Sequence, residues 1–205
     1  VVFVLKQPWR TFKPGAPIAY RLTTLPKTQL AAAPWAAPEL IFQPGPRPAV
    51  QTVASTKSKL VVVLLEDVKG AVDIYDLAKA GQKPVRLALP KDANIGLVDT
   101  ADDSDQIFVT VEGFLDPTSL WLADAGSAKV AKLKTLPARF DASRDVVEQY
   151  WAISTDGTRI PYFVVRPKAA KLDGSTPTIM YGYGGFEVAK PPVYLPEMGK
   201  IWLER

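Results

Sequence analysis

A mainly β chain made of repeated antiparallel units, a partial β-propeller of about three blades, is the fold class that the sequence predicts. The 205 residues include 19 Pro and 13 Gly, and proline interrupts helix interiors. The apolar runs between them are rich in Val, Ile, Leu, Tyr and Phe, which is typical of strands bounded by turns. We expect strands at residues 18–22, 59–65, 71–77, 106–111 and 119–123.

A sequence repeat is the second observation behind this fold class. The run beginning at Val61 aligns with the run beginning at Ile107, and Ile74 aligns with Leu120, so both pairs lie 46 positions apart (61 to 107 and 74 to 120). A weaker third copy lies upstream, where we expect the proline-rich stretch 34–48 to form a long loop. A period in the forties with several strands per unit indicates propeller blades. A β-sandwich with coincidentally spaced hairpins is the alternative.

The composition changes near residue 140, where residues 136–143 look like a connecting segment. We therefore predict two domains. Residues 1–143 would be the C-terminal part of a propeller domain, and residues 144–205 would be the truncated N-terminal part of a second domain.

The second part of the chain contains its own strand and turn signals. Two apolar runs, 146–153 and 160–165, flank an Asp156-Gly157 pair, which favours a tight hairpin turn. Residues 178–181 are predicted to form a buried strand, and 195–205 to begin a helix.

Composition excludes several kinds of chemistry. The chain has no cysteine, which removes disulfides, thiol nucleophiles and thiolate metal sites, and it has no histidine. A Ser-His-Asp triad needs an imidazole, so these residues cannot complete one. The net charge of +4 comes from dispersed Lys and Arg, which argues against a nucleic-acid partner. No apolar run reaches the length of a membrane span.

The string Tyr181-Gly182-Tyr183-Gly184-Gly185-Phe186 carries the strongest chemical signal. Glycine permits positive φ and close approach of a backbone or ligand. A phenol beside glycine backbone is an O–H donor at neutral pH and suits stabilisation of an oxyanion. An α/β-hydrolase places half of its oxyanion hole after an early strand. A structural glycine-rich turn is the alternative, and the glycine spacing fits neither nucleotide-binding fingerprint.

With these residues in view, the chain resembles the prolyl oligopeptidase family. The resemblance rests on four strings that occur in the family's order and spacing. They span residues 136–141, 156–163, 171–175 and 177–186.

The resemblance implies an α/β-hydrolase domain gated by a propeller, and a serine endopeptidase that cuts short peptides after proline with a Ser-Asp-His triad. By the family motif, Tyr183 would donate its hydroxyl to the oxyanion and Phe186 would line the pocket for the residue before the scissile bond. The Gly184-Gly185-Phe186 ending favours the proline-specific branch over the branch that cleaves after basic residues.

The departures from the family pattern are equally informative. The chain contains neither a Gly-x-Ser-x-Gly elbow nor a histidine, and its first and last residues look like the middle of domains. We therefore expect a fragment that is inactive alone, with a short peptide as the partner of the parent enzyme and with no cofactor, metal, membrane or nucleic acid. The acidic run Asp102–Asp105 is interpreted as a solvated turn. Localisation stays open between cytoplasm and periplasm. A non-catalytic propeller-type binding module is the alternative function.

Overall fold

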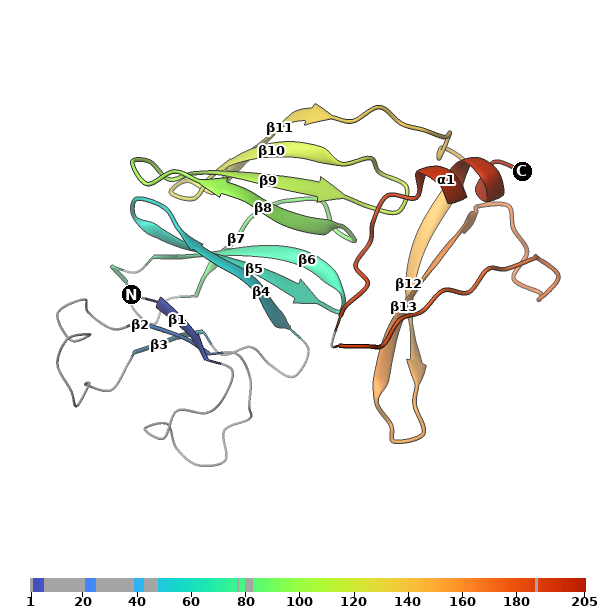
Figure 1. Ribbon diagram of the computed structural model, residues 1–205, viewed down its shortest axis with the longest axis horizontal. Helices are drawn as coiled ribbons and strands as arrows, with labels where there is room; N and C mark the ends of the chain where they lie inside the picture. Colours follow the sequence, from blue (N-terminus) through green and yellow to red (C-terminus); the bar gives the residue numbers. More distant parts are fainter. Residues whose placement is uncertain are drawn as a thin grey trace.

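The computed structural model describes residues 2–5, 21–24, 39–42, 48–76, 78–79, 83–186 and 188–205. Within these residues the protein is mostly β, with four antiparallel sheets and one short helical segment (Figure 1). The strands are β1 (Val2–Leu5), β2 (Arg21–Thr24), β3 (Glu39–Phe42), β4 (Ala49–Ser55), β5 (Lys59–Glu66), β6 (Lys69–Asp76), β7 (Val85–Arg86), β8 (Asn94–Thr100), β9 (Gln106–Glu112), β10 (Ser119–Asp124), β11 (Lys129–Thr135), β12 (Asp145–Ile153) and β13 (Arg159–Pro167). No helix among the described residues is long and apolar enough to cross a membrane.

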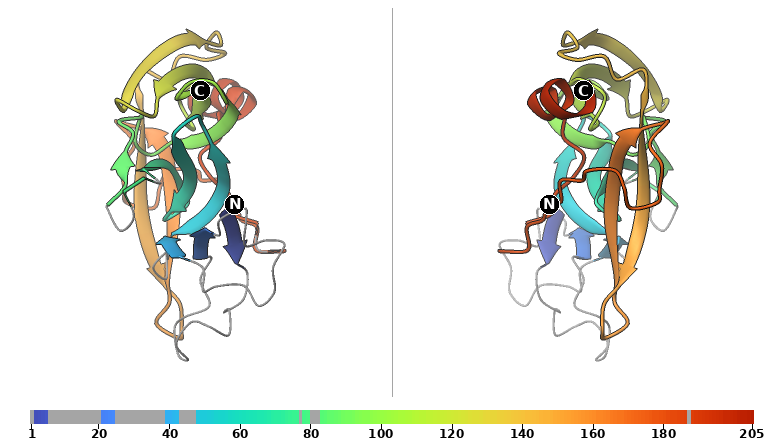
Figure 2. Two further views of the ribbon diagram at one scale, coloured as in Figure 1. Left: turned by 90° about the vertical axis from the view of Figure 1, so that its left-hand side faces the viewer. Right: turned by 90° about the vertical axis from the view of Figure 1, so that its right-hand side faces the viewer.

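Two four-stranded sheets confirm the predicted repeat. Their strand orders are β4-β5-β6-β7 and β8-β9-β10-β11, so each is a meander of consecutive strands. The aligned runs occupy the second and third strands of each sheet, β5 with β9 and β6 with β10. The first strands also share an irregularity, because register shifts leave Gln51 in β4 and Val98 in β8 as bulge residues. Together with β1-β2-β3, these sheets form a partial β-propeller (Figure 2).

The main core lies between the two four-stranded sheets, because each sheet buries one face against the other. Strand β5 is buried on both faces, with Val61 and Val63 in this shared core and Leu60, Val62 and Leu64 in a second cluster on the opposite face. A single blade cannot cover both of its faces, so the stacking of neighbouring sheets creates the core.

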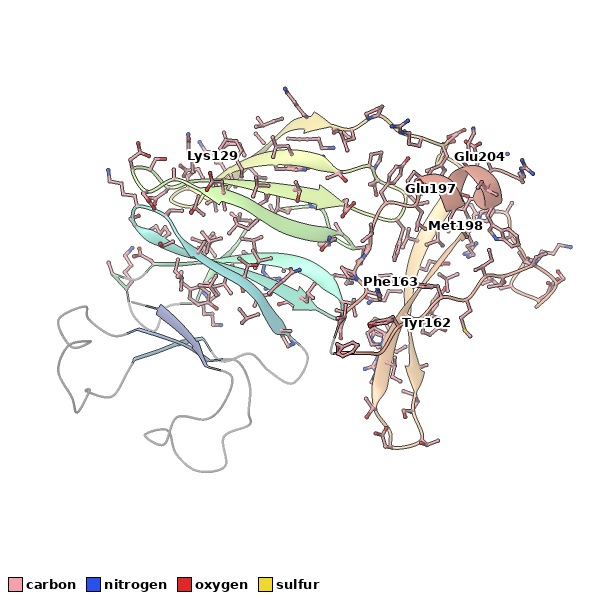
Figure 3. All side chains as sticks on the ribbon, viewed as in Figure 1. Lys129, Tyr162, Phe163, Glu197, Met198 and Glu204 are labelled. Atoms are coloured by element: carbon pink, nitrogen blue, oxygen red, sulfur yellow. The ribbon has the colours of Figure 1, made fainter. Side chains whose placement is uncertain are left out.

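Strand β11 is the exposed edge of the last sheet. Lys129, which Figure 3 labels, Lys132 and Lys134 are all exposed along it. The Lys132 ammonium lies 5.2 Å from the ring centre of Trp121. Lysines on an edge strand discourage pairing with another chain.

The strands predicted between residues 18 and 123 agree with the structure wherever it describes them. Strands β5, β6, β9 and β10 cover the four predicted runs between 59 and 123, and β2 takes in the end of the predicted strand 18–22; residues 18–20 and 77 lie outside the described residues. The loop predicted for 34–48 is wrong at Glu39–Phe42, which forms β3. This tetrapeptide contains no proline and has three apolar residues after Glu39, and it pairs with β2. Most of the remaining stretch lies outside the described residues.

The second part of the chain contains the predicted hairpin and helix. Strands β12 and β13 pair along their full lengths around a turn in which Gly157 has a φ of +83°, the left-handed conformation that glycine adopts without strain. Near the end of the chain, α1 (Pro196–Met198) continues into a π-helical turn, η2 (Gly199–Leu203).

The buried strand predicted at 178–181 is wrong. These four residues have no regular secondary structure and are exposed, with Met180 94% exposed. A strand needs a neighbour to accept and donate its backbone hydrogen bonds, and no described strand lies against this segment.

The hairpin packs against turns of the two four-stranded sheets (Figure 1). The Gln149 side-chain amide donates to the carbonyl of Asp67 in the β5–β6 turn at 2.7 Å. Phe163 of β13 meets Phe114 of the β9–β10 turn edge to face, with ring centres 5.2 Å apart. The Leu195 amide donates to the Phe114 carbonyl at 3.1 Å. These contacts fix where the second part of the chain lies relative to the propeller.

Candidate functional site

The predicted site residues lie on the segment between β13 and α1. A turn follows the glycines of the string, in which the Val188 amide donates to the Gly185 carbonyl at 3.1 Å. Phe186 occupies the corner of the turn with a φ of 55°. A positive φ is uncommon for a non-glycine residue and is held here by the turn hydrogen bond.

The glycines of the string serve different purposes. A Cβ on Gly185 would lie 3.0 Å from the Tyr183 hydroxyl oxygen, so glycine lets this hydroxyl rest on the backbone. A Cβ on Gly182 or Gly184 would meet nothing within 4 Å. Phe186 has a positive φ, whereas Gly182, Gly184 and Gly185 do not. These glycines contribute to the site a backbone without side chains.

The two aromatic site residues are accessible. The Tyr183 side chain is 49% exposed and Phe186 is 93% exposed. The structure thus leaves Tyr183 half-exposed and does not bury its ring in a packed interior.

A lysine that the sequence reasoning missed lies over the tyrosines. The Lys190 ammonium is 4.7 Å from the ring centre of Tyr183 and 5.8 Å from that of Tyr181. Both separations are within the range of a cation–π interaction. Lys190 follows Tyr183 by seven residues, a spacing that predicts no contact outside a helix. The contact depends on the turn at Phe186, which only the structure shows.

A groove of about 660 Å³ lies apart from these residues, between the connecting segment and the C-terminal helix. Its lining includes Leu136, Pro137, Arg139, Tyr194, Pro196, Glu197, Lys200 and Ile201. Figure 3 labels Glu197 in α1 and Glu204 directly after η2. The Tyr194 hydroxyl accepts from the Arg139 amide at 2.8 Å, and Glu204 accepts from the Asp141 amide at 2.8 Å. These contacts hold the helix to the segment that follows the last blade.

Two of the carboxylates with lowered pKa values, Glu66 and Asp105, lie in the blades. Arg86 lowers the pKa of Glu66 chiefly through hydrogen bonds, and the same guanidinium binds Asp73. In the acidic run, hydrogen bonds from Thr56 and Ser58 lower the pKa of Asp105. No group of three or more Asp or Glu among the described residues could hold a metal ion.

The repeated four-stranded sheets define the class of protein, a β-propeller protein whose propeller is present in part. Residues 22–136 match the family model described as the prolyl oligopeptidase N-terminal β-propeller domain. The chain therefore belongs to the prolyl oligopeptidase family, as the sequence strings predicted.

Individual relatives agree with this assignment. An uncharacterized peptidase of Sinorhizobium fredii is 41% identical over the whole chain, which covers 28% of that protein. Prolyl oligopeptidase A of Amanita bisporigera is 32% identical over 68% of the chain, covering 18% of that protein. The structure of a post-proline cleaving enzyme from Rickettsia typhi superposes on 99% of the chain with a TM-score of 0.80 at 28% identity, covering 30% of that enzyme. The chain thus spans less than a third of the relatives it matches.

Proposed function

We propose that this chain is part of a serine oligopeptidase that cleaves short peptides after proline by acyl transfer. Residues 1–143 would supply the later propeller blades, and residues 144–205 the opening of an α/β-hydrolase domain. The observation that carries the proposal is the half-exposed Tyr183, whose hydroxyl lies beside the Gly185 backbone within a chain of this family.

The proposed chemistry assigns one task to each site residue. A serine oxygen bonds to the substrate carbonyl carbon, the carbonyl oxygen gains negative charge, and the Tyr183 O–H donates a hydrogen bond to it. The amine of the scissile bond then leaves with a proton, and water later releases the acyl group. The Phe186 ring suits the residue before the scissile bond, because proline offers a flat apolar surface without an N–H. The backbone of Gly184 and Gly185 leaves room for the substrate to approach.

The serine and the base must come from outside this chain, because it has no histidine and no Gly-x-Ser-x-Gly elbow. Large apolar side chains are exposed on the hairpin and on the segment after it, which is the signature of a surface that another element covers. They include Ile153, Ile160, Tyr162, Ile179, Met180 and Tyr181. This exposed surface supports a further sheet packed against residues 144–205, and we expect no hydrolysis from the chain alone.

The test begins with the full reading frame. A Gly-x-Ser-x-Gly motif followed by Asp and His would support the peptidase, and their absence would favour the non-catalytic binding module. In the intact protein, Tyr183→Phe should lower kcat for a blocked Gly-Pro reporter peptide by about 10²–10³. Tyr181→Phe is the matched control, because it removes a hydroxyl two residues away and should leave kcat unchanged. Equal rates for Tyr183→Phe and the wild type would refute the oxyanion role, and equal turnover of Gly-Pro and Gly-Ala peptides would refute the proline preference.

A further inference from the structure

We propose that Lys190 is a positioning residue for Tyr183, an inference that rests on the function proposed above. Its ammonium would hold the phenol ring in place and would put a positive charge beside the oxygen on which negative charge develops.

The contacts of Tyr183 restrict its ring from two directions. The Lys190 ammonium lies over the ring face, 4.7 Å from its centre, and the hydroxyl lies against Gly185. The same ammonium is 5.8 Å from the Tyr181 ring centre, so one cation bridges both tyrosines. The turn between Gly185 and Val188 makes this possible, because it folds the chain back over the string.

The charge of Lys190 is not taken up by a described carboxylate. The salt bridges found among the described residues involve other cations, namely Lys59, Lys69, Lys79, Arg86, Arg166 and Lys200. The ring faces are therefore the partners that the structure gives to this ammonium.

This arrangement suits an oxyanion donor, which must lie within about 2.7–3.1 Å of the oxygen it stabilises. A half-exposed phenol without restraint would sample several rotamers. Ordering the phenol during the reaction would raise the activation free energy and so lower kcat. The substrate carbonyl is neutral before attack, so the positive charge acts mainly on the transition state. Loss of Lys190 should therefore lower kcat and leave KM nearly constant.

The experiment compares three variants of the intact protein on the Gly-Pro reporter peptide. Lys190→Met keeps an unbranched stem without the charge and should lower kcat about 2- to 5-fold, the range of an exposed cation–π interaction. Lys190→Arg keeps a cation that stacks on rings and should recover most of the rate. Lys171→Met removes another exposed lysine and should have no effect.

A double-mutant cycle with Tyr183→Phe separates the inference from the proposed function. The effect of Lys190→Met should vanish when the Tyr183 hydroxyl is absent. If Tyr183→Phe is slow while Lys190→Met keeps the wild-type rate, the inference fails and the proposed function stands. If Tyr183→Phe keeps the wild-type rate, both fail. Equal losses in Lys190→Met and Lys190→Arg, or a Lys190→Met loss that persists without the hydroxyl, would also overturn the role of the charge.

A spectroscopic measurement tests the contact itself in the intact protein. Protons on the lysine carbon next to the ammonium should show an upfield ring-current shift in the NMR spectrum, and Tyr183→Leu should reduce it. A random-coil shift for Lys190 in the wild type would overturn the proposed contact whatever the kinetics show.

Discussion

Replacing Asp105 by alanine should loosen the contact between the two four-stranded sheets. Asp105 lies in the β8–β9 turn and accepts three hydrogen bonds from the β4–β5 turn of the neighbouring sheet. The donors are the Thr56 hydroxyl at 2.7 Å, the Ser58 amide at 2.9 Å and the Ser58 hydroxyl at 2.7 Å. Ser58 and Asp105 occupy corresponding turns of the repeat, so one carboxylate joins two equivalent loops.

The magnitude follows from the burial of the donors. Ser58 is exposed and will be hydrated when Asp105 is removed. Thr56 is only 8% exposed, and its hydroxyl would then have only the Lys59 carbonyl, at 3.4 Å, as an acceptor, while it still accepts from the Lys59 amide at 3.2 Å. We therefore expect Asp105→Ala to lower the free energy of unfolding by about 1–2 kcal/mol, less than a fully buried charged hydrogen bond would cost. Asp105→Asn keeps an acceptor oxygen and should cost less. Asp102→Ala, exposed in the same turn, should be nearly neutral.

The pH dependence gives the deciding measurement. The hydrogen bonds lower the pKa of Asp105 in the folded chain, so its stabilisation is complete well above the unfolded pKa of about 3.9 and is lost as the pH falls through the folded pKa. Urea unfolding followed by tryptophan fluorescence should show a difference between wild type and Asp105→Ala that is constant from pH 7 to about pH 5 and smaller at pH 3. A difference of the same size at pH 3, or none at pH 7, would refute the reasoning.

Two further predictions concern packing. Arg86→Ala should lower the free energy of unfolding by about 2–3 kcal/mol in urea unfolding, because it removes the cation that binds Asp73, which is only 4% exposed. Arg86→Lys should restore part of this free energy. An unchanged free energy of unfolding in Arg86→Ala would contradict the prediction. A double-mutant cycle of Phe114→Leu and Phe163→Leu should give a coupling energy of about 0.5–1.5 kcal/mol from the edge-to-face contact. Additive effects would mean that the two rings do not hold the hairpin to the blade.

The elements that the sequence predicts correctly are those that depend on neighbours close in the chain. Strands β5 and β6 pair across a two-residue turn, and β9 and β10 form the corresponding hairpin of the next sheet across the longer turn 113–118. Apolar runs of strand length, bounded by residues that favour turns, are sufficient to predict such meanders. Strand β3 was missed because proline content dominated the prediction for its surroundings, although the Glu39–Phe42 run contains no proline.

Residues 178–181 show the limit of local sequence. Their apolar character resembles that of β5, yet β5 has β4 and β6 on its two sides, whereas no described strand flanks 178–181. Strand formation depends on a partner that the run itself does not encode. The site shows the same limit, since the motif identified Tyr183 and Phe186 but not Lys190, whose contact depends on how the backbone turns at Phe186.

One repeat length explains two separate contacts of the propeller. Strand β5 has the β4–β5 turn at one end, where Ser58 meets Asp105 of the next blade, and the β5–β6 turn at the other, where Asp67 meets Gln149 of the hairpin. The corresponding β9–β10 turn carries Phe114 to the same hairpin. The repeat brings equivalent turns side by side at both ends of the blades. At one end the β4–β5 and β8–β9 turns bind each other, and at the other end the β5–β6 and β9–β10 turns contact residues 144–205. Variants at the first end should therefore change the stability of the propeller, whereas variants at the second should change how the site segment is held.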